Sequence, residues 1–184
     1  KAAERIKSEF NKPVYVIDSK NLSGALGLLV LKIAKAIEEE MPIQDIVKSA
    51  EEWIKNLKIF VSVKDLKYMI KGGRDSKNKG FLATLLGINP VVSMDSEGKA
   101  MLFGKTFGQK ANINKVINHI RTLTERQQVW NYIVLHAQNR KGADIYINKM
   151  YALTGKQPVS VVDISPVIGM NAGIGSIAVS LLLE

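Results

Sequence analysis

The sequence predicts an α/β protein whose second half is a mixed β-sheet with helices on one face. Three observations support this prediction. Residues 14–17 form a short run that is apolar on both faces, which is typical of a strand buried in a parallel sheet. Residues 22–37 and 43–57 carry apolar side chains at helical spacing. Beyond residue 58 a hairpin lies among alternating strands and helices, and that order favours a mixed sheet.

The first half has a simple order of elements. Apolar residues at helical spacing predict a helix over residues 1–10, and Pro13 follows its end. The strand at residues 14–17 comes next. Asp18 and Ser19 follow it at its carboxyl end, where open α/β sheets place ligand-binding groups. Asn21 or Ser23 is the predicted cap of the helix over residues 22–37, and Pro42 opens the helix over residues 43–57.

The second half alternates strands and helices around one hairpin. A turn of Asp95, Ser96, Glu97 and Gly98 joins the two hairpin strands. The predicted strands are 59–63, 90–94, 99–103, 132–136, 159–164 and 177–183, and the predicted helices are 66–70, 81–86, 113–120 and 144–153.

Composition limits the possible functions. The 184 residues contain no Cys, which excludes a disulfide scaffold, a Cys-ligated zinc site and a thiol nucleophile, and which fits a cytoplasmic protein. No apolar stretch approaches the roughly 20 residues of a membrane-spanning helix. The net charge of +9 raises the question of nucleic acid binding. However, Tyr15, Phe60 and Tyr132 fall in predicted core strands, so an aromatic and basic nucleic acid surface is the weaker interpretation.

A basic glycine turn is the first candidate binding site. Gly72 and Gly73 permit a sharp turn, and Arg74 presents a planar set of donors that suits a carboxylate or phosphate. Between residues 64 and 79 there are six Lys or Arg and two Asp. A solvated turn with scattered surface charge explains the same pattern equally well.

The glycine-rich segment 165–175 is the second candidate. It follows a predicted strand, and its backbone N–H groups could converge on an anion, although a tight connection between two strands is the simpler interpretation. His119 and His136 each stand alone and are interpreted as structural. No metal-ligand spacing, phosphate-binding loop or acid–base pair is present, so no cofactor is expected.

Several motifs in register resemble the bacterial DegV family, and the resemblance covers nearly the whole chain. These motifs are Val16-Ile17-Asp18-Ser19 with residues 23–30, then Val63 to Arg74, residues 85–92, and Pro166 to Gly173. The resemblance implies the DegV-like (EDD) fold, in which a Rossmann-like parallel-sheet lobe is joined to a C-terminal lobe with a mixed sheet. Residues 1–57 would be the remnant of the first lobe with its connecting helices, and residues 58–184 the second lobe.

The resemblance also implies a function. Family members are carriers, not enzymes, that hold a long-chain fatty acid between the lobes, and some present it to a separate fatty acid kinase. By this resemblance Arg74 and Gly73 would lie at the carboxylate end of the site. Asn171, Ala172 and Gly173 would form the loop that closes over the carboxylate. Ser19 is the further candidate ligand-binding residue.

Two departures from the family pattern leave alternatives open. Asn171 stands where the family usually has His, and Asn cannot titrate or carry positive charge. A regulatory or adaptor domain that has lost lipid phosphorylation, partnering a kinase-like domain or fused to one, is therefore the second hypothesis. The Ser and Thr motifs of the family's first lobe do not occur either, so the chain is expected to be a fragment of a longer protein.

Overall fold

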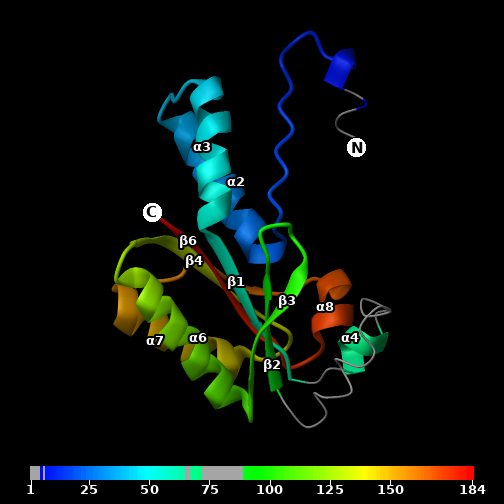
Figure 1. Ribbon diagram of the computed structural model, residues 1–184, viewed down its shortest axis with the longest axis vertical. Coiled ribbons are helices and arrows are strands. Elements are labelled where there is room, and N and C mark those ends of the chain that lie inside the picture. The colour runs from blue at the N-terminus through cyan, green and yellow to red at the C-terminus, as the bar shows by residue number, and fades with distance from the viewer. Residues whose placement is uncertain (1–4, 6, 65–66, 72–88) are drawn as a thin grey trace.

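The computed structural model describes residues 5, 7–64, 67–71 and 89–184. Two long helices come first, α2 (Ser23–Glu38) and α3 (Ile43–Asn56), and they lie side by side above the sheet in Figure 1. Both match helices that the apolar spacing predicts. Pro42 ends the short link between them and precedes the first residue of α3, where a fixed backbone φ suits a helix start.

A six-stranded mixed sheet forms the centre of the fold. Its strands lie in the order β3-β2-β1-β6-β4-β5, and only the pair β4 and β5 is parallel. The strands are β1 (Leu57–Ser62), β2 (Asn89–Met94), β3 (Ala100–Thr106), β4 (Val129–His136), β5 (Ser160–Asp163) and β6 (Ile177–Leu183). Every residue of β6 is buried, because this strand lies between β1 and β4 and is covered on both faces.

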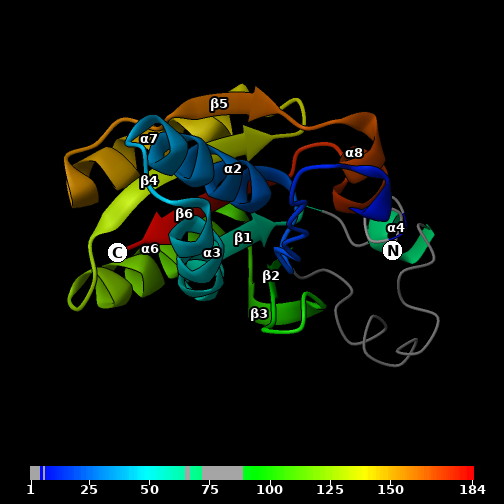
Figure 2. The same cartoon turned by 90° about the horizontal axis from the view of Figure 1, so that it is seen from above.

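The two faces of the sheet carry separate cores. Helices α6 (Gln109–Thr124) and α7 (Arg140–Thr154) pack on one face, where Phe60, Tyr132 and Tyr146 are fully or almost fully buried. Helix α2 packs on the other face through Leu28 and Leu29. Figures 1 and 2 show these helices around the sheet, with the short helices α4 (Lys67–Lys71) and α8 (Pro166–Ala172) beside one end of it.

The α/β class and the mixed sheet that the sequence predicts are confirmed, and within residues 58–184 the long helices α6 and α7 share one face. The opposite face is covered by α2, which belongs to the segment before residue 58. The division of the chain at residue 57 stays a prediction. No helix in the described ranges is long and apolar enough to cross a membrane.

Two local predictions are wrong. Residues 14–17 form no strand; they belong to an extended segment that leaves the body of the fold (Figure 1), and Tyr15 and Val16 are each 40% exposed. An apolar run becomes a strand only beside a partner strand, and none of the described strands pairs with it. The helix predicted over residues 1–10 lies partly outside the described residues: Arg5 is helical and Lys7–Glu9 form a 3₁₀ turn, η1. Leu22 occupies the N-cap of α2 in place of Asn21 or Ser23.

Neither Asn21 nor Ser23 caps α2, and the Asn21 side chain makes a different hydrogen bond. The Asn21 amide donates to the Ser19 carbonyl oxygen at 3.2 Å, and the Ser19 hydroxyl donates to the Asn21 carbonyl oxygen at 3.1 Å. These bonds close a turn before the helix. Ser23 starts α2 with a positive φ of 55°, so its side chain does not take the capping position.

Candidate functional site

A narrow apolar cleft lies between the start of α2, the sheet and α8. Twelve residues line it, and nine of them are apolar: Leu22, Ser23, Ile59, Val61, Leu135, His136, Ile164, Ile168, Ala172, Ser176, Ile177 and Ala178. Its volume is about 30 Å³. That is far below the roughly 300–1,000 Å³ of a typical ligand pocket, so the cleft is narrow in this structure.

Helix α8 forms the outer wall of this cleft. The sequence interprets residues 165–175 as a glycine-rich loop or tight connection, and this interpretation is wrong for residues 166–172, which are helical. Pro166 provides a preformed first turn, and Gly173 ends the helix with a positive φ of 81°. No residue of α8 is buried. Ile168 and Ala172 face the cleft, while Val167 and Met170 are 66% and 65% exposed.

The structure describes four of the binding residues that the sequence predicts, and it does not bring them together at one site. Ala172 lines the apolar cleft. The Asn171 amide donates to the Val167 carbonyl oxygen at 3.2 Å, within its own helix. Gly173 packs against the ring of Tyr68. Ser19 closes the turn before α2 and is not among the cleft-lining residues.

Gly73 and Arg74 lie outside the described residues, as do the predicted helix at 81–86 and most of the basic stretch 64–79. Their part in a binding site stays a prediction.

His136 is a polar residue of the cleft that the sequence interpretation treats as merely structural. Its side chain is 11% exposed, and its Nδ1 atom lies 3.4 Å from Asp163 Oδ1 without a hydrogen bond. His136 ends β4 and Asp163 ends β5, and the two are register partners in the parallel pair. His136 ends the predicted strand 132–136, and Asp163 is the last residue but one of the predicted strand 159–164. Since parallel strands end at the same edge of a sheet, that pattern could have brought them together.

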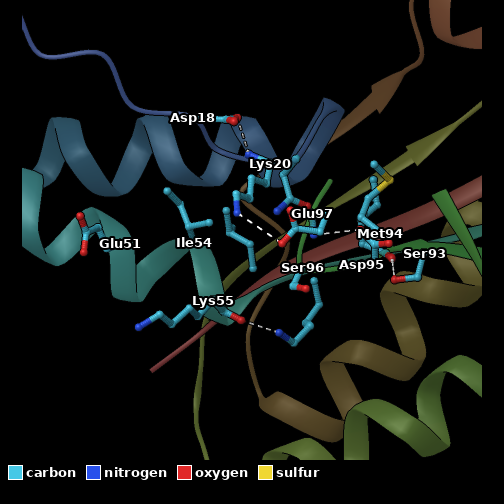
Figure 3. Close-up of a pocket in the computed structure, with 14 residues that line it drawn as sticks. Asp18, Lys20, Glu51, Ile54, Lys55, Ser93, Met94, Asp95, Ser96 and Glu97 are labelled. Atoms are coloured by element: carbon cyan, nitrogen blue, oxygen red, sulfur yellow. Dashed lines mark hydrogen bonds and ion pairs between the residues drawn. The ribbon is translucent and has the colours of Figure 1, made fainter. Parts of the chain in front are cut away.

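A second, larger cleft is strongly charged. It has a volume of about 610 Å³ and lies between the turn before α2, the end of α3 and the β2–β3 hairpin (Figure 3). Its charged lining residues are Asp18, Lys20, Glu51, Lys55, Lys58, Asp95 and Glu97. Desolvation by burial lowers the pKa of Lys58, whose ammonium donates to the Lys55 carbonyl oxygen at 2.6 Å. Four carboxylates make this cleft a poor place for an acyl chain or for its carboxylate.

Metal chemistry has no support in the described part of the chain. No group of three or more His, Cys, Asp or Glu side chains there could hold a metal ion. The apolar cleft under α8, which has few polar groups in its lining, is therefore the better candidate site for a ligand.

A family model described as an uncharacterised protein of the DegV family matches residues 1–184. The chain belongs to the DegV family. It is 32% identical over 171 residues to a DegV domain-containing protein of Clostridium acetobutylicum, covering 92% of this chain and 60% of that relative. A similar protein of Streptococcus pyogenes is 30% identical over 162 residues, with 88% of this chain and 57% of the relative covered. The DegV chain thus spans somewhat more than half the length of the curated relatives it matches.

Solved DegV structures share this fold. A fatty acid binding DegV family protein from Streptococcus agalactiae superposes with a TM-score of 0.87 at 24% identity, covering 98% of this chain and 64% of that one. A fatty acid binding DegV protein from Bacillus subtilis gives a TM-score of 0.84 at 25% identity, with 100% and 65% covered. A DegV family protein from Eubacterium eligens loaded with heptadecanoic acid gives 0.81 at 22% identity, with 100% and 66% covered.

Proposed function

We propose that this DegV chain is part of a fatty acid carrier, and that the acyl tail lies in the cleft between the sheet and α8. The observation that carries the proposal is the apolar lining of that cleft in a chain of the DegV family. Solved relatives described as fatty acid binding proteins support the choice of ligand. Under this proposal the protein acts as a carrier in the cytoplasm and catalyses no reaction of its own.

The chemistry of a fatty acid suits this site. Each CH₂ group removed from water contributes about 0.8 kcal/mol, so a long chain gains most of its binding energy from an apolar wall. In the present structure the cleft is almost closed. Because none of the α8 residues is buried, moving this helix outward exposes little that is now packed away. Ligand entry therefore requires a shift of α8, with Ile168 and Ala172 then lining the chain.

Arg74, Gly73, Asn171, Gly173 and Ser19 remain the proposed polar contacts from the family pattern. Presentation of the fatty acid to a kinase belongs to the same proposal. Asn171 favours a second candidate function, that of an adaptor which binds lipid but does not support its phosphorylation, since an amide cannot titrate or carry positive charge as His can. Comparing phosphoryl transfer to bound oleate in native protein and in Asn171→His, with a fatty acid kinase, separates the two. Full turnover by the native protein contradicts the adaptor role.

Titration of the chain with oleate tests the carrier proposal, and two variants of α8 form a matched pair. Ile168→Asn places an amide in the cleft and is expected to weaken oleate binding about tenfold, because a buried polar group without a partner costs roughly 1–3 kcal/mol. Met170→Asn makes a similar change on the 65% exposed side of the same helix and should leave the affinity nearly unchanged. Equal effects of the two variants, or no oleate binding by the native chain, contradict the proposal.

A further inference from the structure

The helices on the two faces of the sheet differ in charge. Helices α6 and α7, on one face, carry six Lys or Arg side chains and a single acidic side chain, that of Asp144. Helices α2 and α3, on the opposite side (Figure 1), carry four basic and four acidic side chains. The positive charge of the four long helices is therefore concentrated on the outer side of α6 and α7, which we call the basic face.

The side chains of the basic face have few acidic neighbours. Its fully exposed cations, apart from Arg140, are Lys110, Lys115, Arg121 and Lys141. Within the part of the chain that the structure describes, none of these four forms an ion pair. The ion pair of the face joins Arg140 Nε to Asp144 Oδ1 at 2.9 Å. Like charges without partners repel one another, so this face has the electrostatics of a surface that binds an anionic partner.

The starts of α6 and α7 lie side by side at one end of the basic face. Gln109 is the first residue of α6, and Asn139 is the N-cap of α7. The Asn139 amide donates to Gln109 Oε1 at 3.3 Å, and both side chains donate to the carbonyl oxygen of Gly175. Lys110 directly follows Gln109, and Lys141 comes two residues after Asn139, so these bonds bring both lysines to the same end of the face.

Phe107 adds an apolar side chain to that end. It lies two residues before α6 and is 81% exposed, more than any other large hydrophobic residue in the described ranges. Ile145 lies one turn after Lys141 on α7 and is 43% exposed. An aromatic or aliphatic side chain gains free energy when it leaves water. Lysines beside exposed apolar side chains match both the charge of anionic lipid headgroups and the apolar boundary beneath them.

Two other anionic partners fit this face less well. Four of its six basic residues are Lys, whereas protein–protein interfaces are depleted in Lys and enriched in Arg. The phosphates of duplex nucleic acid could pair with the lysines but would leave Phe107 in water. A bilayer that contains anionic lipids accommodates the cations and the phenylalanine together.

We propose that the basic face of α6 and α7 docks on membranes that contain anionic lipids, with Phe107 inserted among the headgroups. Docking of this kind does not depend on the proposed fatty acid binding, because the apolar cleft lies on the other face of the sheet. For a fatty acid carrier it has a use, since it holds the protein at the surface into which long acyl chains partition.

Sedimentation with lipid vesicles tests the proposal. The native chain is expected to bind vesicles of phosphatidylcholine with about one third phosphatidylglycerol, and not vesicles of phosphatidylcholine alone. Binding should fall steeply as the salt concentration rises from about 0.1 M to about 0.5 M, because salt screens the attraction.

Two triple variants change the charge equally on the two faces. Each basic side chain beside an anionic bilayer strengthens binding about fivefold, so neutralising three should weaken it about a hundredfold. The variant of the basic face combines Lys110→Gln, Lys115→Gln and Arg121→Gln. The control, which should bind like the native chain, combines Lys35→Gln, Lys48→Gln and Lys55→Gln on α2 and α3. All six positions are exposed, so both variants are expected to fold.

Phe107→Ser tests the contact with lipid itself. It should weaken binding to the anionic vesicles about tenfold, whereas Ile37→Ser, at a 57% exposed position of α2, should leave it unchanged. No binding of the native chain to these vesicles, or an equal loss in the two triple variants or in the two serine variants, overturns the proposal. Binding to duplex DNA or to polyglutamate without binding to vesicles also overturns it, and assigns the face to nucleic acid or to an acidic protein.

Discussion

The ring of Tyr68 packs directly on the backbone of Gly173. Tyr68 belongs to α4, and Gly173 is the residue that ends α8. A Cβ built on Gly173 would lie 2.2 Å from Tyr68 Cδ2, closer than any real contact. The pair therefore joins two short helices at one end of the sheet, and it fixes where the outer wall of the apolar cleft ends.

Gly173→Ala is expected to destabilise the protein by about 2–3 kcal/mol, because it adds a steric clash to a strained positive φ. Gly155→Ala is the matched control, since Gly155 also has a positive φ but has nothing within 4 Å of its Cβ position. That variant should lose only about 1 kcal/mol. Urea unfolding of the two variants measures the difference, and equal losses would show that the Tyr68 contact does not constrain α8.

Gly24→Ala should destabilise the packing of α2 on the sheet. Its Cβ would lie 2.8 Å from both Leu135 Cδ1 and Ser180 Oγ, so these buried side chains or α2 itself must shift, at a cost of about 1–3 kcal/mol. Gly27→Ala lies one turn later on the same helix, with its nearest contact at 3.6 Å. It should gain about 0.5–1 kcal/mol from helix propensity. Calorimetric melting of both variants tests the contrast, and a stabilised Gly24→Ala would contradict it.

Most of the sheet and the long helices could be predicted because their signals are local. The strand at residues 177–183 and the helix over residues 22–37 follow from apolar side chains at strand and helix spacing. The strand at residues 14–17 carries an equally good apolar signal and still fails. Strand formation needs a hydrogen-bonding neighbour, and that information does not lie in the segment itself.

The candidate site was harder to predict than the fold. Three glycines made residues 165–175 look like a loop, yet Pro166 begins a short helix before Gly173 ends it. Asn171 therefore bonds within its helix, while the neighbouring Ala172 faces the cleft. The pairing of His136 with Asp163 depends on strand order, which periodicity does not give. Leu22 occupies the N-cap of α2, against the usual preference for a polar side chain at that position.

Lys32 ties α2 to the end of the chain. Its ammonium lies 3.0 Å from Glu184 Oε2 and 4.6 Å from the centre of the Trp130 ring. Lys32→Met keeps the aliphatic stem but removes both interactions, and it should cost about 1 kcal/mol. The exposed Lys35, 3.6 Å from Glu39, is the control, and Lys35→Met should cost less than about 0.5 kcal/mol. Urea unfolding followed by tryptophan fluorescence measures both free energies of unfolding. An equal loss of stability in the two variants would show that Lys32 contributes no more than an exposed ion pair.

Stability should fall at high pH because of two buried tyrosines. Burial raises the pKa of Tyr132 to about 12, and burial also raises the pKa of Tyr146, partly offset by its hydrogen bond with Ser62. The ordinary pKa of an exposed tyrosine is about 10. Between pH about 10 and about 12 the unfolded chain therefore ionises Tyr132 while the folded chain keeps it protonated. The stability contributed by the neutral phenol is fully present below pH about 10 and is lost progressively as the pH rises through that window.

Urea midpoints measured from pH 8 to about 11.5 test this, with Tyr132→Phe as the variant. The native chain should lose stability relative to Tyr132→Phe above pH about 10, whereas their difference should stay constant below it. That constant difference reflects the hydrogen bond from the Tyr132 hydroxyl to the Lys156 carbonyl oxygen at 2.9 Å. Tyr151→Phe, at a position that is 50% exposed, controls for the loss of a phenol. Parallel profiles for the native chain and Tyr132→Phe would show that Tyr132 ionises equally in both states, and burial would then not govern its titration.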